Sequence, residues 1–428
     1  MLKKVIIFTI LSAIMFSSFS LYSFAFNLDK SEASADGYYL YDTNHNILMA
    51  EDNCDKRISP SSTVKIMSAC IVLESRIDLQ QEITVTESMI KEVSGRSMYL
   101  KNGDKLTVED LLYAMLCGGY NDATHILALT IYPAIYKFTE KMNEKAKLLG
   151  MNDTHYLNPT GIDSVGMHTT INDIAKLAKY MAQNELFVTI CSTRYYKLSE
   201  KATCNYKTIT NRSSLITEYK GLSNFNTGSN NNGDCAVLFY KTNDTSLISI
   251  VMNAKSLDKK DTRNFAEIYS KKLISHAIND YSTKTVKTNK EIITTLPLKY
   301  SISSTEIDIY AQQNLEIFIA NDVDLEKDIT YSLSFSDIEL KAPLKSGDIV
   351  GRLTVFYDGI ILGSTPLIVN ENVERNTFLY VLDVMKQFIL SKVFWIILLS
   401  FVLLLVIYHK HQNKKFKKTR RKTRKKPT

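Results

Sequence analysis

The chain lacks the patterns that mark metal-binding and repeat proteins. Its seven histidines show no metal-ligand spacing, and its six cysteines form no Cys-x-x-Cys pair. We therefore expect no metal and no cofactor, and isolated buried thiols for most cysteines, with a Cys191–Cys204 disulfide as the open alternative. No repeat of solenoid period is present. A chain of 428 residues is long enough for two folded domains and targeting segments.

Acidic residues are absent from the segment 409–428, which carries eleven Lys and Arg. This tail accounts for the net charge of +7, so the rest of the chain is mildly acidic and is not expected to bind nucleic acid. The tail follows an uncharged run, 393–408, close to the ~20 residues that cross a bilayer. The positive-inside rule predicts a transmembrane helix with a cytoplasmic basic tail, and it places the preceding chain outside the cell membrane. A buried core helix is the alternative.

The N-terminus has the pattern of an export signal. Lys3 and Lys4 precede the apolar run 5–16, and Ser23-Phe24-Ala25 fits a small-x-small cleavage site. We predict a signal peptide over 1–25. An uncleaved anchor helix is the alternative, although the apolar run is short for one.

Apolar periodicity predicts strands at both ends of a first domain, 26–282, with helices between them. A hairpin is expected over 37–49 and strands over 235–240 and 247–252. Helices are expected over 63–75, 107–114 (with Thr107 and Asp110 in capping-box register), 122–129, 134–149, 171–184 and 262–278. First and last strands that meet in one sheet, with helices packed on it, predict an α+β fold with an antiparallel sheet and a helical cluster.

The chain after the first domain has a different sequence pattern. Residues 281–289 are polar and resemble a linker, whereas 290–372 hold only short alternating stretches punctuated by Gly347 and Gly351. These features predict a small β-rich C-terminal domain. The segment 376–391 is apolar on one face and is expected to lie along a membrane surface.

One short motif carries nucleophilic chemistry. Ser62-Thr63-Val64-Lys65 places a serine and a lysine three residues apart at the start of a predicted helix, so that both lie on one face. A lysine desolvated in a cleft has a lowered pKa and can accept the serine proton. The spacing alone is weak evidence, because Ser256 and Lys259 repeat it.

The surroundings of this motif resemble those of the serine D-alanyl-D-alanine carboxypeptidases, the low-molecular-mass penicillin-binding proteins. The resembling stretches run in the family's order: 60–67, 111–116, 121–123, 142–151, 158–162, 168–170 and 342–351. The resemblance implies a β-lactamase/transpeptidase-like domain followed by the family's small β domain. It also implies peptidoglycan stem peptides as substrates and β-lactams as covalent inhibitors.

Carried over to this chain, the resemblance makes Ser62 the acylated nucleophile, Lys65 its general base and Asn121 a substrate-holding amide. The family's second motif begins with a serine that relays a proton, and this chain has Gly119 there. Removing such a group typically costs about 10²–10³ in rate.

The third motif also departs from the family. Asn226-Thr227-Gly228 stands where a Lys-Thr-Gly is expected, so a positive charge is missing. Thr227 can still bond the substrate, and the backbone NH groups of Ser62 and Ser229 are expected to form the oxyanion hole. Arg263 is a candidate for a compensating cation. Tyr120 is a candidate for the missing hydroxyl, with simple packing as the alternative.

Two functions follow from these residues. The first is a slow D,D-carboxypeptidase acting through a Ser62 acyl-enzyme, because the nucleophile and base are both present. The second is an impaired homologue that binds stem peptide or a cell-wall partner without turnover, because of Gly119 and Asn226. A β-lactamase is weaker still, since no deacylating carboxylate is evident.

Overall fold

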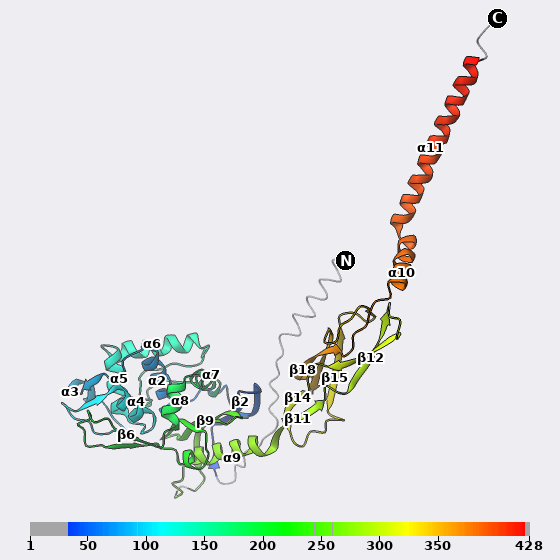
Figure 1. The fold of residues 1–428 in the computed structure, drawn as a ribbon. Coiled ribbons are helices and arrows are strands. Elements are labelled where there is room, and N and C mark those ends of the chain that lie inside the picture. Colours follow the sequence, from blue (N-terminus) through cyan, green and yellow to red (C-terminus); the bar gives the residue numbers. More distant parts are fainter. Residues whose placement is uncertain (1–32, 92, 244, 259, 424–428) are drawn as a thin grey trace. The chain divides into compact units, whose positions relative to one another are not determined.

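The computed structural model describes residues 33–423 apart from 92, 244 and 259. The predicted signal peptide therefore lies outside the described residues. The chain forms two compact units, 1–281 and 282–428 (Figure 1).

A six-stranded antiparallel sheet organises the first unit. Its main path runs β3 (Ile47–Asp52), β2 (Gly37–Asp42), β10 (Ser246–Ser256), β9 (Gly233–Lys241) and β8 (Leu222–Asn230), and β1 (Ala33–Ser34) also pairs with β10. The first hairpin thus pairs with strands from the end of the domain, as the sequence pattern predicted. β8 is the last strand of this path and, among the described strands, pairs only with β9, so its other edge can contact an element outside the sheet.

Helices cover the sheet. The central one, α2 (Val64–Glu74), has nine buried residues out of eleven, which is typical of a helix that is apolar on all sides. Around it lie α3 (Glu87–Ile90), α4 (Val108–Leu116), α5 (Asn121–Ile131), α6 (Ile135–Leu148), α7 (Ile171–Met181) and α8 (Glu185–Ser192). Helix α9 (Phe265–Asp280) packs on β9 and β10, on the side of the sheet away from α2 (Figure 1).

Local signals explain several boundaries. The capping box predicted for α4 is present, because the Thr107 hydroxyl accepts from the Asp110 NH and the Asp110 carboxylate accepts from the Thr107 NH. The single helix predicted over 171–184 was wrong at its end: α7 stops at Met181, and Asn184 caps a separate helix, α8. All six cysteines are buried and free, so the alternative of a Cys191–Cys204 disulfide is not realised. Short strands complete this unit: β4 (Glu82–Thr84) with β5 (Lys105–Thr107), and β6 (Tyr195–Lys197) with β7 (Thr208–Thr210).

The second unit begins as an all-β domain. Its main sheet has the order β15 (Ile329–Phe335), β17 (Ile349–Tyr357), β18 (Ile360–Val369), β13 (Glu306–Ala311), β12 (Ile292–Lys299) and β16 (Leu340–Lys341). A second sheet pairs β11 (Tyr281–Lys287) with β14 (Leu315–Ala320). The prediction of a polar linker over 281–289 was therefore wrong, because its alternating residues form a strand that pairs with β14.

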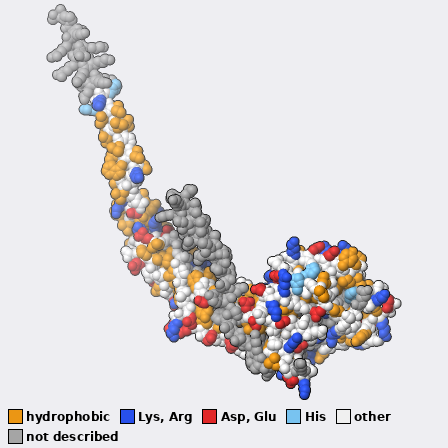
Figure 2. Space-filling model, turned by 180° about the vertical axis from the view of Figure 1, so that it is seen from behind, with side chains coloured by type: hydrophobic (Ala, Val, Ile, Leu, Met, Phe, Trp, Pro, Cys, Tyr) orange, Lys and Arg blue, Asp and Glu red, His pale blue; other side chains and the backbone are white. Residues whose placement is uncertain are grey.

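Two helices follow the β domain. Helix α10 (Thr377–Leu390) is capped by the Asn376 side chain, and its residues are not buried. In α11 (Lys392–Thr423), the segment Lys392–His411 is long and apolar enough to cross a membrane. Hydrophobic side chains cover this segment in Figure 2.

Candidate active site

Ser62 lies in a one-turn 3₁₀ helix, η1 (Ser61–Thr63), directly before α2. The residue before it, Ser61, has a φ of +50°, so the chain enters the turn in a conformation that non-glycine residues rarely adopt. Such strain is typical of functional turns. The Thr63 hydroxyl donates to the Pro60 carbonyl at 2.5 Å and helps to hold the turn. Ser62 itself stays partly exposed.

Two glycines press against this turn. A Cβ placed on Gly161 would lie 1.9 Å from the Ser61 carbonyl oxygen, and Gly161 has a φ of +84°. A Cβ placed on Gly228 of β8 would lie 2.8 Å from both Cβ and Oγ of Ser62. The loop 158–161 and strand β8 therefore approach the Ser62 turn from two directions, at distances that only glycine allows.

Lys65 lies one helical turn after Ser62. Its side chain is 1% exposed, and Nζ donates to the Thr160 carbonyl at 2.7 Å. Burial lowers the pKa of Lys65 to about 7, and the positive charge of Arg212 contributes in the same direction. A large fraction of the Lys65 amine is therefore neutral near pH 7 and able to accept a proton.

The second motif occupies the turn between α4 and α5. Asn121 begins α5, and its side-chain amide donates to the Ser94 carbonyl at 2.8 Å. Gly119 has a φ of +72°, which disfavours any side chain there. Tyr120 is buried between Tyr206 and the guanidinium of Arg96, 5.0 Å from the ring centroid. Its surroundings are those of a packing residue.

The third motif lies on β8, next to Ser62. Asn226 and Gly228 lie on one face of the strand because side chains alternate, and Gly228 faces Ser62. Asn226 is 2% exposed, and its Oδ1 has no hydrogen-bond partner. The Thr227 hydroxyl donates to Asn224 Oδ1 at 2.6 Å, so its proton is already committed to a buried amide. The Ser229 hydroxyl donates to Asp234 Oδ1 at 2.6 Å.

The two candidate arginines occupy different environments. Arg263, the sequence-based candidate, is largely exposed, and its Nη2 lies 2.6 Å from Asp261 Oδ2. Arg212, which the sequence analysis missed, passes beside both altered motifs: its Cδ lies 2.9 Å from a Cβ placed on Gly119, and its Nη1 lies 3.7 Å from one placed on Gly228. The sequence signal that could have identified Arg212 was its position ten residues before the start of β8.

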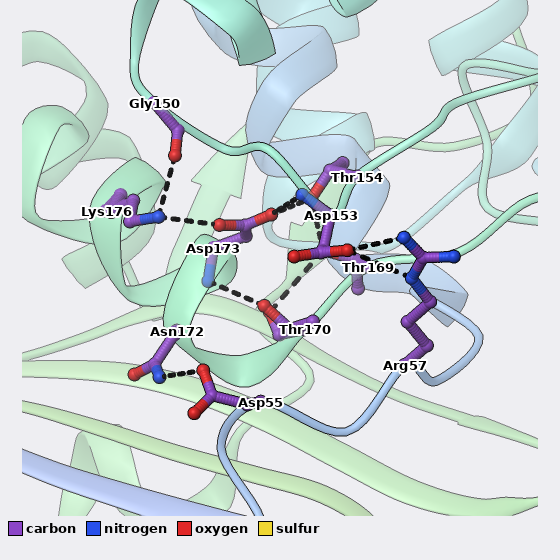
Figure 3. A network of polar contacts seen from close by, with 10 residues as sticks. All are labelled: Asp55, Arg57, Gly150, Asp153, Thr154, Thr169, Thr170, Asn172, Asp173 and Lys176. Atoms are coloured by element: carbon purple, nitrogen blue, oxygen red, sulfur yellow. Dashed lines mark hydrogen bonds and ion pairs between the residues drawn. The ribbon is translucent and has the colours of Figure 1, made fainter.

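A polar network holds the segment that leads to Ser62 (Figure 3). The buried Asp173 carboxylate of α7 accepts from the Asp153 NH at 2.9 Å and from the Thr154 hydroxyl at 2.8 Å. Asp153 in turn pairs with Arg57. Ile58 and Thr169 exchange two backbone hydrogen bonds, each of 2.9 Å. The network therefore ties the residues just before Ser62 to α7.

We expect Asp173→Ala to lower the free energy of unfolding of the first unit by about 2–3 kcal/mol, because buried donors lose their acceptor. Asp55→Ala is the matched control: Asp55 belongs to the same network and accepts from Asn172 at 2.7 Å, but it is exposed. Its loss should cost under about 1 kcal/mol. Denaturant unfolding followed by far-UV circular dichroism measures the free energy of unfolding of both variants. Equal losses would contradict the structural role given to Asp173.

Comparison with known proteins agrees with this geometry. The family model "D-alanyl-D-alanine carboxypeptidase" matches residues 25–256, and "Penicillin-binding protein 5, C-terminal domain" matches 281–375. The chain is 23% identical to the carboxypeptidase DacF of Bacillus subtilis over 332 residues, covering 76% of this chain and 82% of that protein. It is 28% identical to DacC of Escherichia coli over 368 residues, covering 82% and 87%.

The fold is shared with solved structures. Penicillin-binding protein 5 of Haemophilus influenzae superimposes with a TM-score of 0.57 at 22% identity, covering 82% of this chain and 100% of that one. The carboxypeptidase DacD of Francisella tularensis gives 0.58 at 21% identity, covering 85% and 98%. The resemblance and the fold class inferred from the sequence are thereby confirmed. The chain belongs to the D-alanyl-D-alanine carboxypeptidase family, the low-molecular-mass penicillin-binding proteins.

Proposed function

We propose that this protein is a serine D-alanyl-D-alanine carboxypeptidase that removes the terminal D-alanine from peptidoglycan stem peptides, at a reduced rate. The observation that carries the proposal is the position of Lys65 one helical turn after Ser62, with Lys65 buried and its pKa lowered to about 7. Ser62 is partly exposed and therefore within reach of a substrate.

The chemistry proceeds in two steps. Ser62 Oγ attacks the carbonyl carbon of the scissile peptide bond while its proton moves to the neutral Lys65 amine. The bond to the terminal D-alanine then breaks, the leaving amine takes a proton, and an ester between Ser62 and the peptide remains. Water hydrolyses this ester and restores the Ser62 hydroxyl. The backbone NH groups of Ser62 and Ser229 are the proposed donors to the oxyanion.

Substrate binding is assigned to the residues around Ser62. Asn121, Asn226, Thr227 and Gly228 contact the substrate in this proposal, and β-lactams acylate Ser62 as covalent inhibitors. Thr227 acts as an acceptor or re-orients its hydroxyl, since its proton is held by Asn224 in the free protein. Two departures, at Gly119 and Asn226, account for the reduced rate, because each removes a group worth about 10²–10³.

The protein is also proposed to be anchored in the cell membrane. The uncharged run 393–408, within the apolar segment Lys392–His411, crosses the bilayer once, and the basic tail 409–428 stays in the cytoplasm. The first unit then lies outside the membrane, where peptidoglycan is found. Helix α10, with exposed apolar residues such as Phe378 and Leu390, lies on the outer membrane surface.

The proposal is tested by release of free D-alanine from a stem pentapeptide by the detergent-solubilised protein, with Ser62→Ala measured beside it. We expect slow release that disappears in Ser62→Ala, because the proposed acyl-enzyme forms on the Ser62 hydroxyl. Release that is equal in the two proteins would reject the carboxypeptidase. The altered motifs would then favour the second candidate, a homologue that binds stem peptide or a cell-wall partner without turnover.

A further inference from the structure

Arg212 carries a positive charge that has no role in the function proposed above. Its side chain is half-buried, and this burial lowers the pKa of Arg212, with the nearby charge of Arg96 acting in the same direction. Glu267 and Asp234 act on it only at a distance, and no hydrogen bond joins either of them to Arg212 among the described residues. A cation desolvated without a close counterion costs free energy and is therefore unusual in a region that serves only packing.

Two carboxylates act on Arg212 electrostatically, those of Asp234 and Glu267. Asp234 accepts from the Ser229 hydroxyl at 2.6 Å and from the Phe265 NH at 3.0 Å. Glu267 accepts from the Ser214 hydroxyl at 3.0 Å through Oε2, and its buried Oε1 has no hydrogen-bond partner in the described part of the chain. Neither is arranged as a bidentate partner of Arg212, so the guanidinium keeps its hydrogen-bonding capacity for another anion.

The position of Arg212 links the two altered motifs. Its Cδ and Nη1 lie 2.9 and 3.2 Å from a Cβ placed on Gly119, so the side chain occupies space that a residue larger than glycine would need. Nη1 also lies 3.7 Å from a Cβ placed on Gly228, which itself would touch Ser62 Oγ at 2.8 Å. The guanidinium therefore lies beside the nucleophile, between the second and third motifs.

Charge explains why Asn226 accompanies this arrangement. Asn226 lies on the same face of β8 as Gly228, buried, with Oδ1 unpaired. A lysine there would add a further buried cation beside Arg212 and Lys65, and like charges in one desolvated cleft repel one another. A neutral amide avoids this repulsion and still offers two donors to a substrate.

We propose that Arg212 binds the terminal carboxylate of the substrate, in place of the lysine missing from the third motif. This inference rests on the proposed function and assigns its specificity: the ligand must end in a free carboxylate. A planar guanidinium can hold both carboxylate oxygens, which an ammonium group cannot. Asn226 and Gly119 are then parts of one rearranged cation site, in which Gly119 leaves room for the Arg212 side chain.

The test uses binding, so that it does not depend on turnover. The dissociation constants of a stem pentapeptide ending in D-Ala-D-Ala and of its C-terminal amide are measured by calorimetry on the full-length Ser62→Ala protein in detergent. We expect the free acid to bind about 10- to 100-fold more tightly than the amide. Adding Arg212→Gln should weaken acid binding by about this factor and leave amide binding nearly unchanged, so that the preference disappears.

Two variants make the result specific. Arg212→Lys should retain part of the preference, because the charge remains while the bidentate geometry is lost. Arg263→Gln is the matched control, the same substitution at an exposed arginine held by Asp261, and should leave the preference intact. The proposal is overturned if Arg212→Gln keeps the acid preference, if Arg263→Gln removes it, or if the parent protein binds acid and amide equally. Acid preference without D-alanine release by the wild type would reject the carboxypeptidase but not the Arg212 site.

Discussion

Replacing Lys65 with Met is expected to lower the rate of Ser62 acylation by about 10²–10⁴-fold, the usual contribution of a general base. Met has a similar length and fills the buried site, but it cannot take the serine proton. In the wild type, the acylation rate should rise with pH, with a midpoint near 7, because only the neutral Lys65 amine accepts a proton and its pKa is about 7. Stopped-flow kinetics with a fluorescent penicillin measures both effects.

The same substitution separates activity from stability. The pKa of Lys65 is lower in the folded than in the unfolded protein, where a lysine keeps its ordinary value near 10.4. The unfolded state therefore binds more protons between about pH 7 and 10, so this residue lowers the stability as the pH falls through that window. Lys65→Met removes the effect, and we expect a melting temperature at neutral pH no lower than that of the wild type. A variant that acylates at the wild-type rate would contradict the role of Lys65.

Gly161→Ala is expected to lower the free energy of unfolding by about 2–4 kcal/mol, and to slow acylation of the molecules that still fold. The new Cβ would lie 1.9 Å from the Ser61 carbonyl and 3.1 Å from Ser62 Cα, in a residue whose φ is +84°. Because the atoms it meets are backbone, relief requires the Ser62 turn or the loop 158–161 to move. Thermal unfolding and the acylation rate constant report the two consequences.

Gly103→Ala is the matched control for the cost of placing a side chain on a residue with a positive φ. Gly103 has a φ of +92°, but a Cβ there would meet nothing within 4 Å. Its substitution should cost only about 1–2 kcal/mol and leave the acylation rate unchanged. If Gly161→Ala behaves like Gly103→Ala in both measurements, the close approach of the loop to the nucleophile does not constrain the site.

The parts of the fold that sequence predicted well depend on local rules. The spacing of Ser62 and Lys65, the apolar residues of α2 and the capping box of Thr107 each act within one or two helical turns, so a linear reading finds them. The helix predicted over 171–184 ran past the end of α7, and α8 was not predicted, because the capping role of Asn184 depends on its backbone conformation. The strand β11 was missed because its polar alternation is stabilised by pairing with the distant β14.

In the candidate site, too, some residues could be assigned from the sequence and others only from contacts between distant segments. Ser62, Lys65 and the two altered motifs were assigned from their resemblance to the family's motifs and from the order of these motifs along the chain. Arg212 was not, because it reaches the site only when β8 and the turn at Gly119 come together in space. The search for a compensating cation turned to Arg263, which the structure places against Asp261. The arginine that we propose in place of the missing lysine precedes β8, whereas Asn226 lies on it.

We claim that Ser62 remains an activated nucleophile although the second and third motifs have changed. The most direct test is intact-mass and peptide-mapping analysis of the full-length protein after incubation with benzylpenicillin. We predict one penicilloyl adduct, located on Ser62 and absent from Ser62→Ala. An unmodified wild-type protein after prolonged incubation, or an adduct that persists in Ser62→Ala, would contradict the claim.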